Sequence, residues 1–195
     1  ETIAFVGGLH AAIGDAVLAN GGTLARSMGD AVMAFWNAPL DDDDHAANAC
    51  AAAVSAVAAV RQLDRQFRDE AIAEGNKPGW IGIGVGVSTG FCCVGNLGSG
   101  ERVDYSAVGE EVGMAERLQA FAETYGVPVV LSEATVSHMT NPQVLELDLV
   151  KIKGRGKPLR LFTPIAAIEG DPGVLARLAE AHEKMIACYR NREWD

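Results

Sequence analysis

Apolar residues recur with a helical spacing over the first twenty positions. From Ile3 to Ala19 they fall at 3, 5, 6, 9, 13, 17 and 18, which predicts a helix that ends at Gly21-Gly22. Two short strand-like runs follow, Thr23–Ser27 and Ala31–Trp36, on either side of Gly29-Asp30. Strand, Gly-Asp and strand together are typical of a β-hairpin with a tight turn.

The rest of the pattern alternates helices with strands. Helices are expected over 45–68, over 110–124 and from Asp171-Pro172 onward, where proline suits the first helical position. Strands are expected over 80–88, 91–96, 127–131, 145–152 and 158–162, the last two forming a hairpin around Gly154-Arg155-Gly156. Ser132 is expected to cap a short helix. Helices mixed with several hairpins predict a mixed or antiparallel sheet.

Two segments have unusual faces. The strand at Trp80–Ser88 alternates branched apolar residues with Gly82, Gly84 and Gly86, so one face is bare. This spacing does not match G-x-G-x-x-G, and a dinucleotide fingerprint is not supported. The final helix has an apolar stripe that could dock on its own domain, cover a partner or begin a linker, and docking on its own domain is favoured.

Composition narrows the class of protein. The 195 residues are 49% hydrophobic and 22% charged, which is typical of one globular domain with a real core. The net charge of −10 disfavours nucleic acid and anionic membranes as partners. The four cysteines form no C-x-x-C pair, so we expect reduced thiols and a cytoplasmic location. The longest apolar run, 46–60, is shorter than the ~20 residues that span a membrane.

Asp30 is the first candidate for chemistry. A carboxylate at a rigid turn tip can hold a hard divalent cation, which takes one or two protein carboxylates plus substrate phosphates. Aspartate is also common in turns for backbone reasons alone, and the turn by itself favours that interpretation.

Several segments in order resemble one family. The strings GDAVMAFWNAPLDDDDHA from Gly29, GIGVGVSTGFCCVGNLGSGERVDYSAVGEEVGMAERL from Gly82, YGVPVVLSEAT from Tyr125 and ELDLVKIKGRGKPLRLF from Glu146 are similar to class III adenylyl/guanylyl cyclase catalytic domains of the bacterial type. The resemblance covers about Thr2 to Ile165. It implies an α+β fold, a ferredoxin-like α/β sandwich, with the catalytic domain at 1–166 and a C-terminal helical extension at 167–195.

The resemblance also implies a reaction. Class III cyclases convert ATP to cyclic AMP and pyrophosphate in intracellular signalling, by attack of the ribose 3′-hydroxyl on the α-phosphorus. Two Mg²⁺ or Mn²⁺ ions per site stabilise the attacking and leaving oxygens. The family forms its sites across a head-to-tail homodimer, so a second copy of the chain is an expected partner, and membrane contact would come only through an upstream module.

The metal ligands match the family only in part. Asp30 falls on the second metal aspartate, whereas the first belongs to an F-x-D-x-x-G-F motif that would lie upstream of Thr2 and does not occur in this sequence. The chain is therefore either an N-terminally incomplete domain that lacks its first strand or a degenerate cyclase. Incompleteness is favoured, because losing a central strand would expose core.

The substrate-binding positions also match unevenly. Arg26 stands where adenylyl cyclases have a lysine that reads adenine, and Ser106 stands at the partner base-reading position. Arg117 matches the catalytic arginine that stabilises charge on the transferring phosphate, and Lys153 matches the lysine on the terminal phosphates. Gly113 replaces the asparagine that orients the ribose. Outside the resemblance, each of these residues has an ordinary structural interpretation as a surface cation, a strand end or an exposed turn.

Three functions remain open at this point. The first is a homodimeric nucleotidyl cyclase. The second is a cyclase-like module that binds nucleotide or a partner without turnover, motivated by Gly113, Arg26 and the missing aspartate. The third is a structural dimerisation element.

Overall fold

The computed structural model describes residues 2–98, 103–152 and 155–193, without the side chains of residues 2–4, 26 and 28. The N-terminal part consists of helix α1 (Thr2–Ala19), strands β1 (Thr23–Met28) and β2 (Ala31–Phe35), and the long helix α2 (His45–Ala73). The middle part consists of strands β3 (Val85–Val87), β4 (Cys93–Asn96) and β5 (Tyr105–Val108), and helix α3 (Glu110–Tyr125). The C-terminal part consists of β6 (Val129–Ser132), α4 (Glu133–Ser137), β7 (Val144–Val150), β8 (Leu159–Pro164), the 3-10 turn η1 (Ile165–Ala167) and α5 (Pro172–Asn191).

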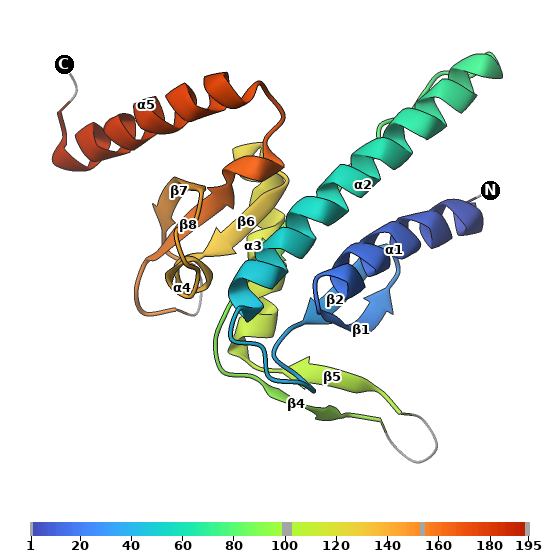
Figure 1. The fold of residues 1–195 in the computed structure, drawn as a ribbon, viewed down its shortest axis with the longest axis horizontal. Helices are drawn as coiled ribbons and strands as arrows, with labels where there is room; N and C mark the ends of the chain where they lie inside the picture. The colour runs from blue at the N-terminus through green and yellow to red at the C-terminus, as the bar shows by residue number, and fades with distance from the viewer. Residues whose placement is uncertain (1, 99–102, 153–154, 194–195) are drawn as a thin grey trace.

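The described strands form one four-stranded sheet and two hairpins. The sheet has the order β3-β6-β8-β7. Strands β3 and β6 are parallel, whereas β8 is antiparallel to both β6 and β7, so the predicted mixed sheet is confirmed. The pairs β1–β2 and β4–β5 are antiparallel hairpins apart from that sheet. In Figure 1, α2 crosses the molecule between the α1–β1–β2 unit and the four-stranded sheet.

Local sequence signals explain the elements that were predicted correctly. Met28 pairs with Ala31, so Gly29-Asp30 forms a two-residue hairpin turn, and Gly29 has a φ of 63°, a conformation that glycine adopts without steric cost. The Ser132 side chain accepts a hydrogen bond from the Thr135 amide and caps α4, as predicted. Asp171 caps α5 and Pro172 is its first residue.

Helix α2 supplies the small residues on which the two halves pack. Its buried positions are mostly alanine, together with Cys50, Val57 and Val60, so neighbouring backbones can approach closely. Cys50 and Val57 join Val129 and Leu131 of β6 in one core cluster. By length and composition alone α2 could cross a membrane, but these buried residues identify it as a core helix. It is also longer than predicted, extending to Ala73.

The prediction of a strand over 80–88 was wrong in extent. Only Val85–Val87 pairs with another strand, and the second predicted strand begins at Cys93. The bare glycine face allows close packing, because α3 lies directly on it. A Cβ added at Gly84 would lie 3.0 Å from the Ala122 Cβ and 3.2 Å from the Gln119 carbonyl oxygen. The absence of a Cβ at Gly84 therefore favours the close approach of the helix to the strand.

The final helix docks on its own domain, as predicted. Helix α5 packs against β7, where the His182 Nε2 lies 2.5 Å from the Glu146 carbonyl oxygen and Arg190 forms an ion pair with the Glu146 carboxylate. Parts of the apolar stripe stay open, since Met185 is 54% exposed and Tyr189 is 60% exposed. The division of the chain at residue 166 stays a prediction.

Candidate active site

Asp30 lies at the exposed tip of the β1–β2 hairpin. It contributes one carboxylate there. Among the described residues, no group of three or more His, Cys, Asp or Glu side chains is arranged to hold a metal ion. A hard cation needs only one or two carboxylates when substrate phosphates and water supply the rest. Asp30 can therefore supply one carboxylate ligand. The described residues do not complete the two-metal centre that the resemblance implies.

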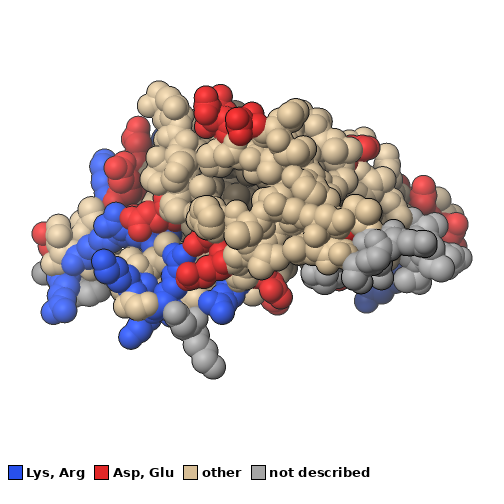
Figure 2. All heavy atoms as spheres, turned by 90° about the horizontal axis from the view of Figure 1, so that it is seen from below, with Lys and Arg blue, Asp and Glu red and all other residues tan. Residues whose placement is uncertain are grey.

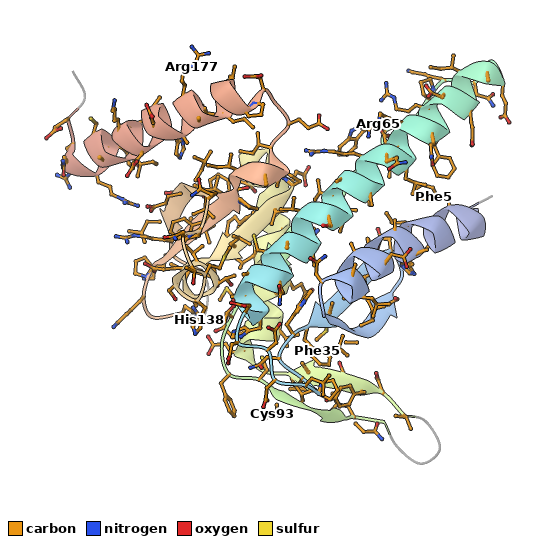
Figure 3. The ribbon with its side chains drawn as sticks, viewed as in Figure 1. Phe5, Phe35, Arg65, Cys93, His138 and Arg177 are labelled. Atoms are coloured by element: carbon orange, nitrogen blue, oxygen red, sulfur yellow. The ribbon has the colours of Figure 1, made fainter. Side chains whose placement is uncertain are left out.

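The two base-reading candidates come from elements that lie against each other. Strand β1 carries Arg26 and contacts β5, which carries Ser106 (Figure 1). Ser106 is 3% exposed and pairs with Gly95 across the β4–β5 hairpin. The rings of Phe35 and Tyr105 lie 5.7 Å apart between the two hairpins, and Figure 3 shows Phe35 reaching towards β5. The structure thus brings the backbones of these two positions into one region.

A register shift in β1 was missed by the sequence analysis. The pairing with β2 is irregular between Leu24 and Arg26. An extra residue in one strand of an antiparallel pair turns the following side chains and increases the local twist. This shift directly precedes Arg26, so the backbone at that position is set by an irregularity that no residue pattern signalled.

Helix α3 carries the catalytic candidate. Arg117 is exposed on this helix, one turn after Gly113. A Cβ added at Gly113 would meet nothing within 4 Å. The position at which the resemblance places an asparagine is therefore open around its Cβ, and a Cβ can be added there without a clash.

Lys153 lies outside the described residues, but the residue two positions later is firmly held. Arg155 Nε lies 3.1 Å from Glu110 Oε1, and the Arg155 guanidinium also forms an ion pair with Glu111. Glu111 in turn accepts a hydrogen bond from the Ser88 hydroxyl. The Glu111 side chain is 13% exposed, which strengthens the interaction by excluding water. We call these four residues the Arg155 clamp.

The Arg155 clamp ties the β7–β8 turn to the first turn of α3. Arg155 is thereby held against the helix that carries Arg117. The sequence contained both partners, a basic Gly-Arg-Gly turn and an acidic start to the helix at Glu110 and Glu111, but their contact depends on tertiary structure.

Charge on the surface is unevenly distributed. Figure 2 shows Lys and Arg side chains gathered at the end of the molecule that holds β7, β8 and α5. Lys151, Lys157 and Arg160 lie in the β7–β8 part of that end. Arg160 is paired there with Glu133 and Glu146, so acidic side chains offset part of this positive charge.

The cysteine beside this site is not suited to nucleophilic chemistry. Partial burial raises the pKa of the Cys92 thiol, and the negative charge of Glu111 raises it further. A raised pKa keeps the sulfur protonated at neutral pH, and the thiol form is a poor nucleophile.

Comparisons with known proteins point to one family of catalytic domains. Residues 2–163 match the family model described as "Adenylate and Guanylate cyclase catalytic domain". Adenylate cyclase 1 of Rhizobium meliloti (strain 1021) is 29% identical over 169 residues, which cover 86% of this chain and 24% of that protein. The adenylate cyclase of Anabaena cylindrica is 28% identical over 168 residues, covering 83% and 32%. This chain therefore spans about a quarter to a third of these relatives.

Solved structures match the fold more completely. The guanylyl cyclase Cya2 has a TM-score of 0.70 at 26% identity, with 87% of this chain and 82% of that chain covered. The adenylyl cyclase CyaB from P. aeruginosa has a TM-score of 0.67 at 24% identity, covering 86% and 82%. The predicted α+β fold with a mixed sheet is confirmed. The names of these neighbours include both adenylyl and guanylyl cyclases.

Proposed function

The chain belongs to the family of adenylate and guanylate cyclase catalytic domains, and we propose that it converts ATP to cyclic AMP and pyrophosphate. In this reaction the ribose 3′-oxygen forms a bond to the α-phosphorus, the bond to the pyrophosphate oxygen breaks, and the hydroxyl proton is released. The observation that carries the proposal is the family match over residues 2–163, within which Arg117 stands on α3. We further propose that the protein acts in the cytoplasm.

The chain's own cations would neutralise charge on the nucleotide. Arg117 would stabilise the charge that develops on the transferring phosphate, an effect worth about 10²–10³ in rate for one such group. Lys153 would contact the terminal phosphates, and the Arg155 clamp would hold its turn against α3. Because nucleotide cyclisation involves little covalent chemistry by the protein, charge and position account for most of the catalysis.

Divalent metal is the expected cofactor, as Mg²⁺ or Mn²⁺. When bound, such ions stabilise the attacking and leaving oxygens. Asp30 would supply one ligand, and the remaining ligands would come from phosphates, water and groups outside the described residues. The described residues of this chain therefore supply only part of the ligand set for the metal.

The choice of base is proposed from two residues. A serine at 106 can donate or accept a hydrogen bond, and an arginine at 26 can only donate. Adenine N1 is an acceptor, so a donor at position 26 is compatible with ATP, and guanine O6 and N7 also accept from arginine, so the assay with both nucleotides decides the base. Contact between β1 and β5 places the backbones of the two positions in one region.

A homodimer is the proposed assembly, with residues of both copies forming each site. The β4–β5 hairpin projects from the body of the molecule (Figure 1) and bears exposed apolar residues. Val103 is 73% exposed, Val108 is 53% exposed, and Phe91 just before the hairpin is 90% exposed. Apolar surface of this kind on a projecting arm is typical of an interface.

A silent, cyclase-like module is the second candidate function, and Gly113 is the observation that favours it. The position that orients the ribose in the family has no side chain here, and its surroundings are open. Such a module would bind nucleotide without turnover. Restoring the side chain with Gly113→Asn separates the two candidates, since a silent module would gain no activity.

The test is a product assay on the purified natural protein. ATP and GTP are each supplied with Mn²⁺ or Mg²⁺, and cyclic nucleotide is measured by chromatography. We expect cyclic AMP from ATP, with kcat lowered about 10²–10³-fold in Arg117→Ala. Arg177→Ala is the matched control, because it removes an equally exposed arginine on α5. The proposal fails if neither nucleotide yields a cyclic product.

A further inference from the structure

Two histidines that are far apart in the sequence have neighbouring, tilted rings at the surface, where His45 is half-buried and His138 is exposed. His45 is the first residue of α2, and His138 directly follows α4. Their ring centroids are 5.7 Å apart, with the ring planes at 52°. Figure 3 shows His138 next to the start of α2. The pair has no part in the cyclase chemistry described above.

The hydrogen bonds of the two rings determine where their protons are. His45 Nδ1 lies 2.9 Å from the Asp42 carbonyl oxygen, and His138 Nδ1 lies 2.8 Å from the Ala134 carbonyl oxygen. A carbonyl oxygen can only accept, so each Nδ1 carries the hydrogen. In the neutral rings both Nε2 atoms therefore have a free lone pair. This is the arrangement that metal-binding histidines show, with the far ring nitrogen donating to a carbonyl.

The spacing of the rings suits one shared ion. A metal bound at about 2.0–2.1 Å from an imidazole nitrogen lies roughly 3.2 Å from the ring centroid. Two rings that share a tetrahedral ion have centroids about 5.2 Å apart, because the two bonds to the ion meet at about 109°. The observed 5.7 Å is within about 0.5 Å of that separation. From this geometry we propose that His45 and His138 bind a single divalent transition-metal ion such as Zn²⁺ or Ni²⁺.

The surroundings define the class of ion. The Asp42 carboxylate is already engaged, since it accepts from the Asp44 amide and from the Asn48 side chain, each at 3.0 Å. No third His, Cys or carboxylate completes a cluster within the described residues, so water fills the other coordination positions. Imidazole ligands favour Zn²⁺, Ni²⁺ and Cu²⁺, whereas Mg²⁺ and Mn²⁺ favour oxygen. The histidine pair is therefore selective against the ions expected at Asp30.

Binding would join two parts of the fold. Helix α2 begins just after the loop that follows the Asp30 hairpin, and α4 follows strand β6 of the sheet. A ligand that binds the folded state and not the unfolded one raises stability. Nickel or zinc is thus expected to raise the Tm of the chain.

The experiment is calorimetric titration of the full chain with NiCl₂ at pH 7.5. We expect one Ni²⁺ per chain and at least about tenfold weaker binding in either His45→Phe or His138→Phe, each of which removes one ligand. Phenylalanine keeps a ring in place, and circular dichroism confirms that each variant folds. Two variants serve as controls and should bind as the wild type does: His182→Gln retains a polar side chain on α5, and Cys93→Ser removes an exposed competing thiol.

A second measurement identifies the ligands directly. Paramagnetic Ni²⁺ should broaden the ring-proton NMR signals of two of the four histidines. MgCl₂ in place of NiCl₂ should cause no such broadening. Equal Ni²⁺ affinity in His45→Phe and wild type, or the absence of saturable one-to-one binding, would overturn the proposal.

Discussion

Replacing Gly86 with alanine tests how closely α3 lies on β3. An added Cβ at this position would overlap the α3 backbone at Ala115 and Gln119 and would lie 3.0 Å from the Leu118 carbonyl carbon. These atoms belong to a helix backbone, so no side chain can rotate to make room. Either the strand or the whole helix must move.

The expected cost follows from two opposing effects. Overpacking of a well-packed site costs about 1–3 kcal/mol, and we take the upper end because backbone is the obstacle. Alanine also restricts the unfolded chain, which returns about 0.4–1 kcal/mol. The net loss is then about 2 kcal/mol, or a fall in Tm of roughly 4–8 °C for a chain of this size.

Urea unfolding followed by circular dichroism measures the effect. Gly95→Ala is the matched control, because it also changes a strand glycine but a Cβ there meets nothing within 4 Å. Gly113→Ala lies in open space within α3 and should gain up to about 1 kcal/mol from helix propensity. If Gly86→Ala unfolds at the same urea concentration as Gly95→Ala, with an unchanged m-value, the close helix–strand contact is refuted.

Three further predictions concern single interactions. Arg155→Ala should lower the free energy of unfolding by about 1–2 kcal/mol, which is less than the loss of a fully buried ion pair would cost, because the arginine side chain is 26% exposed. In the cyclase assay the same variant should raise the KM for ATP. An unchanged KM would mean that the Arg155 clamp does not position the turn. Burial and then the hydrogen bond to Asp148 raise the pKa of Tyr125 to about 12, so its stabilisation is complete below about pH 10 and is lost as the pH rises towards 12. Tyr125→Phe should therefore lose less stability between pH 9 and 11 in urea titrations than the wild type, and an equal loss would argue against this linkage. Ser132→Ala removes the cap of α4 and should cost about 1 kcal/mol in the free energy of unfolding, whereas a loss below a few tenths would show that the cap is unimportant.

Local patterns were sufficient where an element depends on neighbours in the sequence. The hairpin at Gly29-Asp30, the cap at Ser132 and the start of α5 at Asp171-Pro172 were all predicted correctly. The extent of β3 was not, because a strand ends where its pairing partner ends, and that partner is β6, more than forty residues away. The glycines of that segment indicated a bare face without revealing that α3 covers it.

The candidate site also combines residues that the sequence indicated with contacts that only the structure revealed. Asp30, Arg117 and Lys153 were identified from ordered resemblance to a family, and their catalytic roles stay predictions. The Arg155 clamp was not foreseen, because it joins residues of three separate segments.

The sequence by itself determined the element types, the turns, the caps and the family, because these depend on residue identity and short-range spacing. Only the tertiary structure decided which charges meet, such as Arg155 with Glu111, and which rings lie together, such as those of His45 and His138. Packing of α2 and α3 on the sheet brings these distant residues together. That packing depends on the shape of the whole core, which no local pattern encodes.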